Sequence, residues 1–181
     1  MRVNNAWKAV RRWKALSIAA LAGSLLVAAP LHAQTVTATL GVGMDPATAA
    51  VNPVTNQIYV ANFNSNNVTV IDGATNATST VTDPNAVGPG AIAVNPLTNK
   101  IYVANKTSNN VTVIDGVTDT TTTVTNGNGI APFAMAVNPL TNTIYVANQT
   151  SGNVTVIDGA TNTFQTVAAG NFPVALSLIH I

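Results

Sequence analysis

One segment of the chain occurs three times with small changes. It reads AVNPVTNQIYVANFNSNNVTVIDGATN from Ala50, AVNPLTNKIYVANKTSNNVTVIDGVTD from Ala93 and AVNPLTNTIYVANQTSGNVTVIDGATN from Ala136, a period of 43 residues. Each copy consists of short β-rich runs separated by turn signals, with no helical stretch, and a period of this kind is typical of a propeller blade. The sequence therefore predicts an all-β fold, a β-propeller of four-stranded antiparallel blades with about three blades present as an open arc.

Turn signals divide each copy into four expected strands. In the second copy these strands cover residues 91–94, 101–104, 111–114 and 120–125. Between the first two lies NPLTN, in which proline presets a turn torsion and the asparagines tolerate left-handed conformations. A chain reversal is therefore expected there, and the same punctuation predicts four strands in every copy.

The side-chain pattern predicts where each strand lies. In IYVA, Ile101 and Val103 point to one side and Tyr102 and Ala104 to the other, so both sides are apolar and both need covering. Radial blades that pack face to face provide that cover. Residues 120–125 are mostly threonine, which suits an outer strand. A row of small β-sandwiches is the alternative, but each would need about 100 residues.

The repeated motif also carries a family resemblance. YVAN at 59–62, 102–105 and 145–148, each followed by VTVIDG, resembles the YVTN-repeat β-propellers of prokaryotic surface-layer and exported proteins. Ala61, Ala104 and Ala147 stand where that family has threonine. The resemblance covers residues 35–176 and implies the fold. It says little about activity, because related propellers serve as scaffolds, as binding modules, and as frames for quinone or haem cofactors and lactone hydrolysis.

Residues 1–33 have the pattern of a secretory signal peptide. A basic segment with Arg11 and Arg12 precedes an apolar run over 15–29, and small residues precede an expected cleavage after Ala33. The apolar run is shorter than the roughly 20 residues of a membrane span, and an uncleaved anchor is the alternative. We expect an exported protein, periplasmic, extracellular or on the cell surface. The general secretory route is preferred over twin-arginine export because Lys14 interrupts the apolar start.

The repeat phase defines the expected organisation. After the signal peptide, residues 34–45 supply an outer strand whose blade is otherwise missing, and the three blades cover 46–88, 89–131 and 132–176. Residues 177–181, SLIHI, break the repeat and resemble a translated sequencing adapter, with a genuine short tail as the alternative. Because propellers close with four to eight blades, the sequence is interpreted as a C-terminally truncated fragment.

The charge of the expected mature chain disfavours two classes of partner. Removing the signal leaves two lysines against six aspartates, a net charge of minus four. Such a domain lacks the positive surface that nucleic acids and anionic lipids require. No nucleic-acid partner and no membrane span after signal cleavage are expected.

The residue types present also limit the chemistry. Residues 34–176 contain no histidine, cysteine, glutamate or arginine, so a catalytic triad or a soft-metal site cannot be assembled within them. No catalytic residue, metal site or cofactor is assigned. Asp72, Asp115 and Asp158 precede glycine at strand ends and are interpreted as turn caps, with a metal role as the alternative.

Asparagine-rich loops are the candidate binding residues. These loops join the second and third strands, and they should emerge on the same face as the links between blades. Repeated turn chemistry is the competing explanation. The candidates are Asn62, Asn66, Asn67, Asn105, Lys106, Asn109, Asn110, Asn148 and Asn153.

Two classes of function follow. The first is a non-enzymatic exported propeller that binds an envelope component, a protein or a glycan, through its loops or acts as a structural module. The second is a fragment of a propeller enzyme or cofactor-binding protein, of the quinoprotein, haem d1 or lactonase kind, whose reactive residues lie in missing blades. The ligand, the total blade number and the host are not readable from these residues.

Overall fold

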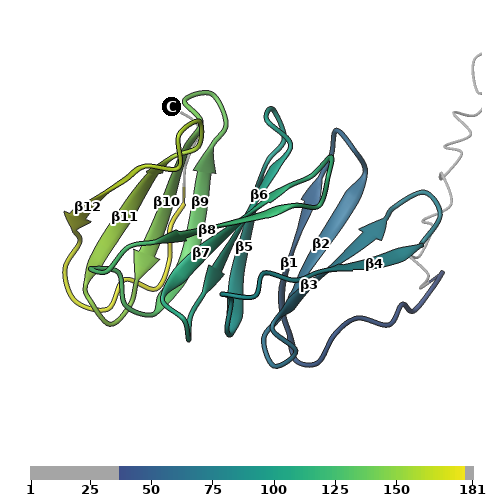
Figure 1. Cartoon of the computed structure of the whole chain (residues 1–181), viewed down its shortest axis with the longest axis horizontal. Helices are drawn as coiled ribbons and strands as arrows, with labels where there is room; N and C mark the ends of the chain where they lie inside the picture. The colour runs from purple at the N-terminus through teal and green to yellow at the C-terminus, as the bar shows by residue number, and fades with distance from the viewer. Residues whose placement is uncertain (1–36, 178–181) are drawn as a thin grey trace, which may run out of the picture. The chain divides into compact units, whose positions relative to one another are not determined.

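Every strand of the described chain belongs to one of three similar sheets (Figure 1). The computed structural model describes residues 37–177, and the chain divides into two compact units, Met1–Thr39 and Leu40–Ile181. The expected signal peptide therefore lies outside the described residues, as does all of the expected artefact except Ser177. The strands lie in the second unit, and no helix occurs in the described range.

The three sheets have the four antiparallel strands that the repeat predicts. Blade 1 consists of β1 (Pro46–Asn52), β2 (Gln57–Asn62), β3 (Asn67–Asp72) and β4 (Thr78–Val81). Blade 2 consists of β5 (Pro89–Asn95), β6 (Lys100–Asn105), β7 (Asn110–Asp115) and β8 (Thr121–Thr125). Blade 3 consists of β9 (Pro132–Asn138), β10 (Thr143–Asn148), β11 (Asn153–Asp158) and β12 (Phe164–Ala168).

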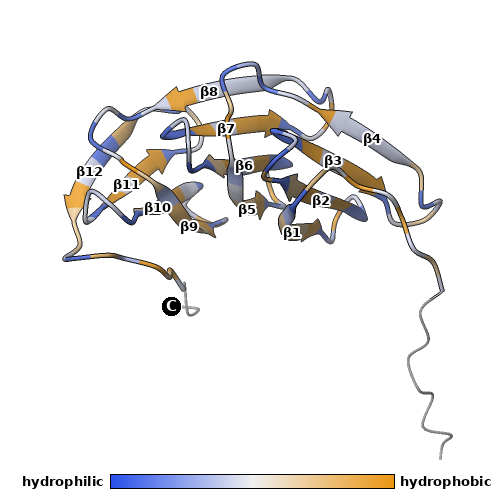
Figure 2. Ribbon diagram, turned by 90° about the horizontal axis from the view of Figure 1, so that it is seen from below, coloured by the Kyte–Doolittle hydropathy of each residue, from blue (hydrophilic) through white to orange (hydrophobic). Residues whose placement is uncertain are grey.

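The blades stand side by side with their first strands innermost. Each sheet is ordered as its strands follow in the chain. In Figure 2, β1, β5 and β9 lie along the inner edge of the fan and β4, β8 and β12 along the outer edge. The prediction of a propeller built of four-stranded blades is confirmed, and so is the placement of the threonine-rich strand at the outside.

Apolar side chains fill both junctions between blades. Ile101 and Val103 of blade 2 join a buried cluster with Tyr59 of blade 1, whereas Tyr102 joins Ile144 and its neighbours in blade 3. Strand β6 therefore packs against one neighbouring blade with one side and the other neighbour with its opposite side. The two-sided burial predicted from IYVA is confirmed.

Both tyrosines in these junctions are fully buried. Burial, assisted by the charge of Asp119, raises the pKa of Tyr59 to about 12, and burial assisted by Asp158 does the same for Tyr102. The Tyr59 hydroxyl donates to Gln57 Oε1 at 2.7 Å. Lys100 occupies the position of Gln57 in blade 2, and the Tyr102 hydroxyl has no hydrogen-bond partner.

Two loop faces result from the antiparallel order. We call the face with the β1–β2 and β3–β4 turns and their repeats the turn face. The link face carries the loops between the second and third strands (63–66, 106–109 and 149–152) and the links between blades (82–88 and 126–131). The expectation that these loops and links emerge together is confirmed by hydrogen bonds such as Thr107 N to Val87 O, 3.1 Å.

Asparagines of the turn face join successive blades. Asn52 Oδ1 accepts from Val54 N, and Asn52 Nδ2 donates to Asn99 Oδ1 of blade 2 at 2.7 Å. Asn95 repeats this arrangement towards Asn142 of blade 3, at 2.8 Å. The turn motif AVNP therefore closes a hairpin and connects two blades at once.

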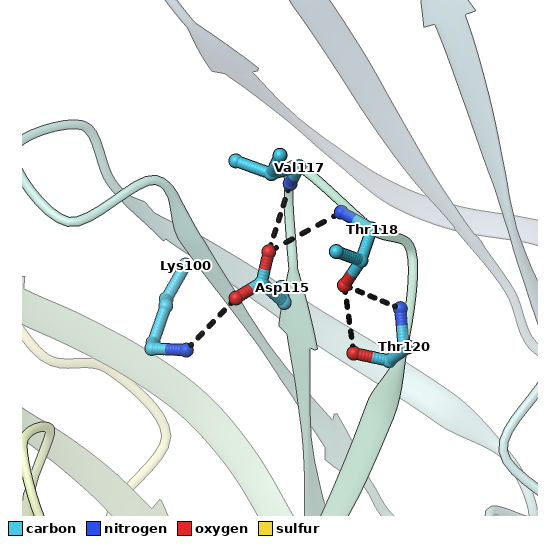
Figure 3. Close-up of polar contacts among 5 residues, drawn as sticks. All are labelled: Lys100, Asp115, Val117, Thr118 and Thr120. Atoms are coloured by element: carbon cyan, nitrogen blue, oxygen red, sulfur yellow. Dashed lines mark hydrogen bonds and ion pairs between the residues drawn. The ribbon is translucent and has the colours of Figure 1, made fainter.

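Aspartates at the ends of the third strands cap turns, as predicted. Asp115 Oδ1 accepts from Val117 N at 2.9 Å and Thr118 N at 3.3 Å, and Lys100 Nζ lies 3.4 Å from Oδ2 (Figure 3). The amide of Val117, together with Thr118 and Lys100, lowers the pKa of Asp115. Amides of Thr75 and Ala74 likewise lower the pKa of Asp72.

Residues 37–43 precede the first blade. They form no strand, although residues 34–45 were expected to supply an outer one. The start of that expected strand lies outside the described residues, and the described part has no strand beside it to complete a ladder. Within the described residues, regular structure begins at Pro46.

Candidate functional site

The link face holds every candidate binding residue, and most of them have structural hydrogen bonds. Asn105 is buried, and its Nδ2 donates to Asn110 Oδ1 at 2.8 Å and to Thr112 Oγ1 at 2.9 Å. The same pattern recurs around Asn62 and Asn148. These three amides fasten the ends of the second and third strands together, beneath the loop.

A second set of asparagines connects blades across the link face. Asn66 has a positive φ of 54°, and its Oδ1 accepts from the backbone N of Gly88, the residue before the next blade, at 2.8 Å. Asn109 does the same for Ala131 N at 2.8 Å. Gly152 occupies this position in blade 3 with φ 64°, where glycine adopts the left-handed conformation without strain but has no side chain to donate or accept.

The remaining predicted asparagines are also engaged. Asn110 Nδ2 donates to Asn85 O at 2.9 Å, and Asn153 Nδ2 donates to Asn128 O at 2.8 Å. Asn67 Oδ1 accepts from Asn62 and from Ser65. All eight predicted asparagines therefore have a role in loop or junction structure, and their role in recognition stays a prediction.

Buried polar residues, for which no role was predicted, anchor the links between blades. Asp83 is buried, and its carboxylate accepts from Thr112 Oγ1 at 2.7 Å and from Thr123 Oγ1 at 2.8 Å, both in blade 2. In the next link Asn126 Nδ2 donates to Thr155 and Thr166. The sequence does contain an indication of this role, because Asp83 and Asn126 occupy the same position of the repeat.

Lys106 is the predicted candidate with a different environment. Its Nζ lies 5.0 Å from the ring centroid of Phe133, the second residue of β9, which is the innermost strand of blade 3. Phe133 is 40% exposed, so a cation and an aromatic ring lie together at the solvent. In blade 1, Phe63 occupies the repeat position of Lys106 and lies near Gly88 and Gly90 of the following blade. Aromatic surface therefore gathers near the inner edge of the link face.

The described residues enclose little volume between the blades. Two cavities of about 10 Å³ lie beneath the links, one bordered by Asp83 and Asn105 and the other by Asn126 and Asn148. Each has room for about one water molecule. Neither of these two cavities has room for a larger ligand.

Residues 37–177 lack two further kinds of feature. No group of three or more histidine, cysteine, aspartate or glutamate side chains lies close enough together to hold a metal ion. No helix in this range is long and apolar enough to cross a membrane.

Comparison with known proteins identifies the family. The model of the family described as "Lactonase, 7-bladed beta-propeller" matches residues 50–169, more than half of the chain. The chain belongs to this family of seven-bladed lactonase-type propellers. A search of curated proteins finds no match.

Solved structures support the same fold. Hydrazine synthase of Kuenenia stuttgartiensis is similar with a TM-score of 0.67 at 22% identity, over 78% of this chain and 42% of that one. A protein of Bacteroides fragilis assigned as a 6-phosphogluconolactonase gives 0.62 at 22%, over 76% and 43%. A nidogen/laminin complex gives 0.63 at 13%, over 72% and 51%. The chain thus spans about half or less of these proteins, and at such identities the likeness shows the propeller fold alone.

Proposed function

We propose that this protein is an exported, non-enzymatic β-propeller whose link face binds a component of the cell envelope. The observation that carries the proposal is the difference between the two loop faces. On the turn face the three copies are nearly identical, reading NPVTN, NPLTN and NPLTN. On the link face the loops begin Phe63-Asn64, Lys106-Thr107 and Gln149-Thr150, so each copy presents different side chains.

This divergence occurs where the fold does not require particular side chains. Asn64, Thr107 and Thr150 are exposed, and the side-chain amides at the base of the loops, such as Asn62, Asn105 and Asn148, belong to other positions of the repeat. Loops presented by a rigid scaffold are common binding sites. Variation between otherwise equal copies therefore favours recognition over scaffold maintenance.

The chemistry of the link face favours a polar, non-nucleic-acid ligand. Lys106 is partly exposed, and its Nζ lies over the ring of Phe133. Around it lie neutral asparagine, serine and threonine side chains. Such a surface suits a protein or a glycan, for which aromatic faces and amide hydrogen bonds supply contacts. The proposed location at the envelope rests on the signal-peptide pattern of residues 1–33.

Sedimentation with purified peptidoglycan and with a solubilised envelope-protein fraction tests this function. Replacing Lys106 and Phe133 with alanine should reduce binding at least tenfold. Leu97 and Leu140 are exposed on the turn face, and their alanine variants are the matched control. Equal binding by both pairs of variants, or no binding by the unmodified protein, would contradict the proposal.

The family match favours a second candidate, lactone hydrolysis. The propeller of this chain would then be a frame, and the catalytic residues would come from blades beyond the three described. A panel of sugar and acyl lactones incubated with a complete seven-bladed form is the test. Lactone turnover by that form would make the enzyme the correct assignment and the link face its substrate surface.

A further inference from the structure

Six asparagines of the chain begin the pattern Asn-x-Thr, the acceptor sequence for N-linked glycans. Five of them lie at the ends of second or third strands, beside the loops of the link face. These five are Asn67, Asn105, Asn110, Asn148 and Asn153. The sixth, Asn76, lies on the turn face, between β3 and β4.

The five link-face asparagines are engaged in the fold. In four of them, all except Asn67, the side-chain nitrogen Nδ2 already donates a hydrogen bond within the link face. Asn67 is half-buried, and the threonine of its pattern, Thr69, is only 4% exposed. Because a glycan is joined to Nδ2 and the pattern also requires the threonine hydroxyl, the folded link face hides these acceptors.

Asn76 has the opposite environment. Both Asn76 and Thr78, the threonine of its pattern, are exposed, as are all the residues from 72 to 80. The turn is held by the backbone, since Asn76 N donates to Asp72 O at 2.8 Å. Its φ of 62° is one that asparagine tolerates well. The turn therefore does not depend on the Asn76 carboxamide, which can carry a substituent.

This exposure does not depend on the ends of the described arc. Asp119 occupies the position of Asn76 in blade 2, which has a neighbouring blade on each side, and Asp119 is also exposed. Its backbone repeats the same hydrogen bond, Asp119 N to Asp115 O at 2.8 Å. The β3–β4 turn of blade 1 would consequently stay accessible in a closed ring.

We propose that Asn76 is the attachment site of an N-linked glycan. The inference rests on the proposed export, since such glycans are carried by surface loops of secreted proteins. The sugar donor is a glycan linked through phosphate to a polyprenyl lipid, and the catalyst is an oligosaccharyltransferase. Asn76 Nδ2 forms a bond to C1 of the first sugar and loses a proton to a base of that enzyme, while the bond from C1 to the phosphate oxygen breaks. The glycan would stand on the turn face and leave the link face free.

Glycan transfer to the purified, folded full chain is the test. The chain is incubated with an oligosaccharyltransferase that recognises Asn-x-Thr and with its lipid-linked glycan, and peptide mass spectrometry gives the occupancy of all six asparagines. Occupancy at Asn76 should exceed that at each of the other five by roughly tenfold or more. Synthetic peptides with the same six sequences should all be accepted, which separates the effect of the fold from that of the sequence.

Three variants at exposed positions sharpen the result. Thr78→Val removes the hydroxyl of the pattern and should abolish transfer to Asn76, whereas Thr78→Ser keeps the hydroxyl and should retain transfer. Asp119→Asn completes an Asn-Thr-Thr sequence in the equivalent turn of blade 2 and should add a second glycan. These residues are exposed, so the blades tolerate the changes.

Two results would overturn the proposal. An Asn76 that stays unmodified in the folded chain, although its peptide is accepted, would show that the turn is not accessible to the enzyme. Comparable occupancy at the link-face asparagines would show that the fold does not select Asn76. The assay requires neither export nor a link-face ligand, so its failure is distinct from a failure of envelope binding in the sedimentation experiment.

Discussion

The anchor in the first link gives the sharpest test of how the blades are joined. Asp83 is buried and accepts from Thr112 Oγ1 at 2.7 Å, from Thr123 Oγ1 at 2.8 Å and from Asn85 N at 2.9 Å. Asp83→Ala leaves these donors without their acceptor, and an unsatisfied buried donor costs about 1–3 kcal/mol. Thr112 is buried, but Thr123 and Asn85 can recover water. We therefore expect a loss of about 2–4 kcal/mol in the free energy of unfolding.

The second link supplies the matched control. Asn126 fills the same repeat position, donates to Thr155 Oγ1 at 2.7 Å and Thr166 Oγ1 at 2.9 Å, and accepts from Asn128 N at 3.0 Å. An amide therefore fits this site with the hydroxyl hydrogen bonds reversed. Asp83→Asn should cost less than about 1 kcal/mol.

Urea denaturation followed by circular dichroism measures both variants beside the unmodified chain. The slope m should be unchanged, so the midpoint reports stability directly. Thermal midpoints should fall by about 2–4 °C per kcal/mol in a chain of this size. If Asp83→Ala lies within about 0.5 kcal/mol of the parent, or Asp83→Asn costs as much as alanine, the anchor does not join the blades as argued.

Three further predictions concern stability. Tyr59→Phe should lower the free energy of unfolding by about 1 kcal/mol because it removes a hydrogen bond. Tyr102→Phe should leave it unchanged or raise it because the Tyr102 hydroxyl has no partner, and equal urea midpoints for the two variants would contradict this. Asn109→Gly should lower the free energy of unfolding by about 1 kcal/mol because it removes the hydrogen bond to Ala131 N. Asn109→Ala should lower it further because alanine is strained at φ 55°, and a higher thermal midpoint for the alanine variant than for the glycine variant would refute this reasoning. The third prediction is a pH dependence. Because the pKa values of Tyr59 and Tyr102 are raised to about 12, their contribution to the free energy of unfolding is fully present below pH 10 and falls by roughly 3 kcal/mol per tyrosine as the pH rises to about 12; a urea midpoint independent of pH in that window would count against their burial. The lowered pKa of Asp115 has the opposite sign, so its contribution is lost as the pH falls through the acid range, and Asp115→Asn should remove that loss.

Strand number, strand order and two-sided burial followed from the sequence because they depend on local patterns. A period of 43 residues fixes the unit, and alternation in IYVA fixes which side chains share a face. Ile101 and Tyr102 could be assigned to opposite neighbouring blades from the sequence alone, since a blade within an arc has one neighbour on each side. The aspartate caps were predictable for the same reason, because the backbone amides that donate to Asp115 belong to residues two and three positions later in the chain.

The roles of the link-face residues depend on distances that the sequence does not contain. Asn66 and Gly88 are 22 positions apart, and Asp83 and Thr123 are 40 apart, so their contacts exist only once neighbouring blades are docked. The pairing of Lys106 with Phe133 depends on the same docking. Asparagine richness therefore predicted that these loops share one face with the links, but it could not separate the amides that build this face from side chains that are free for recognition.

Blade 2 is the one described blade covered by a neighbour on each side. In a repeat array, stability is approximately a sum over units and the contacts between nearest neighbours, so a unit with two such contacts opens last. Backbone amides of β6 and β7 should consequently exchange with solvent deuterium more slowly than those of β2, β3, β10 and β11, although the three sequences are almost the same. Strands of nearly identical sequence would then differ in how rarely they open to solvent because of their position alone. Each added neighbour would make opening of the blade that it covers rarer.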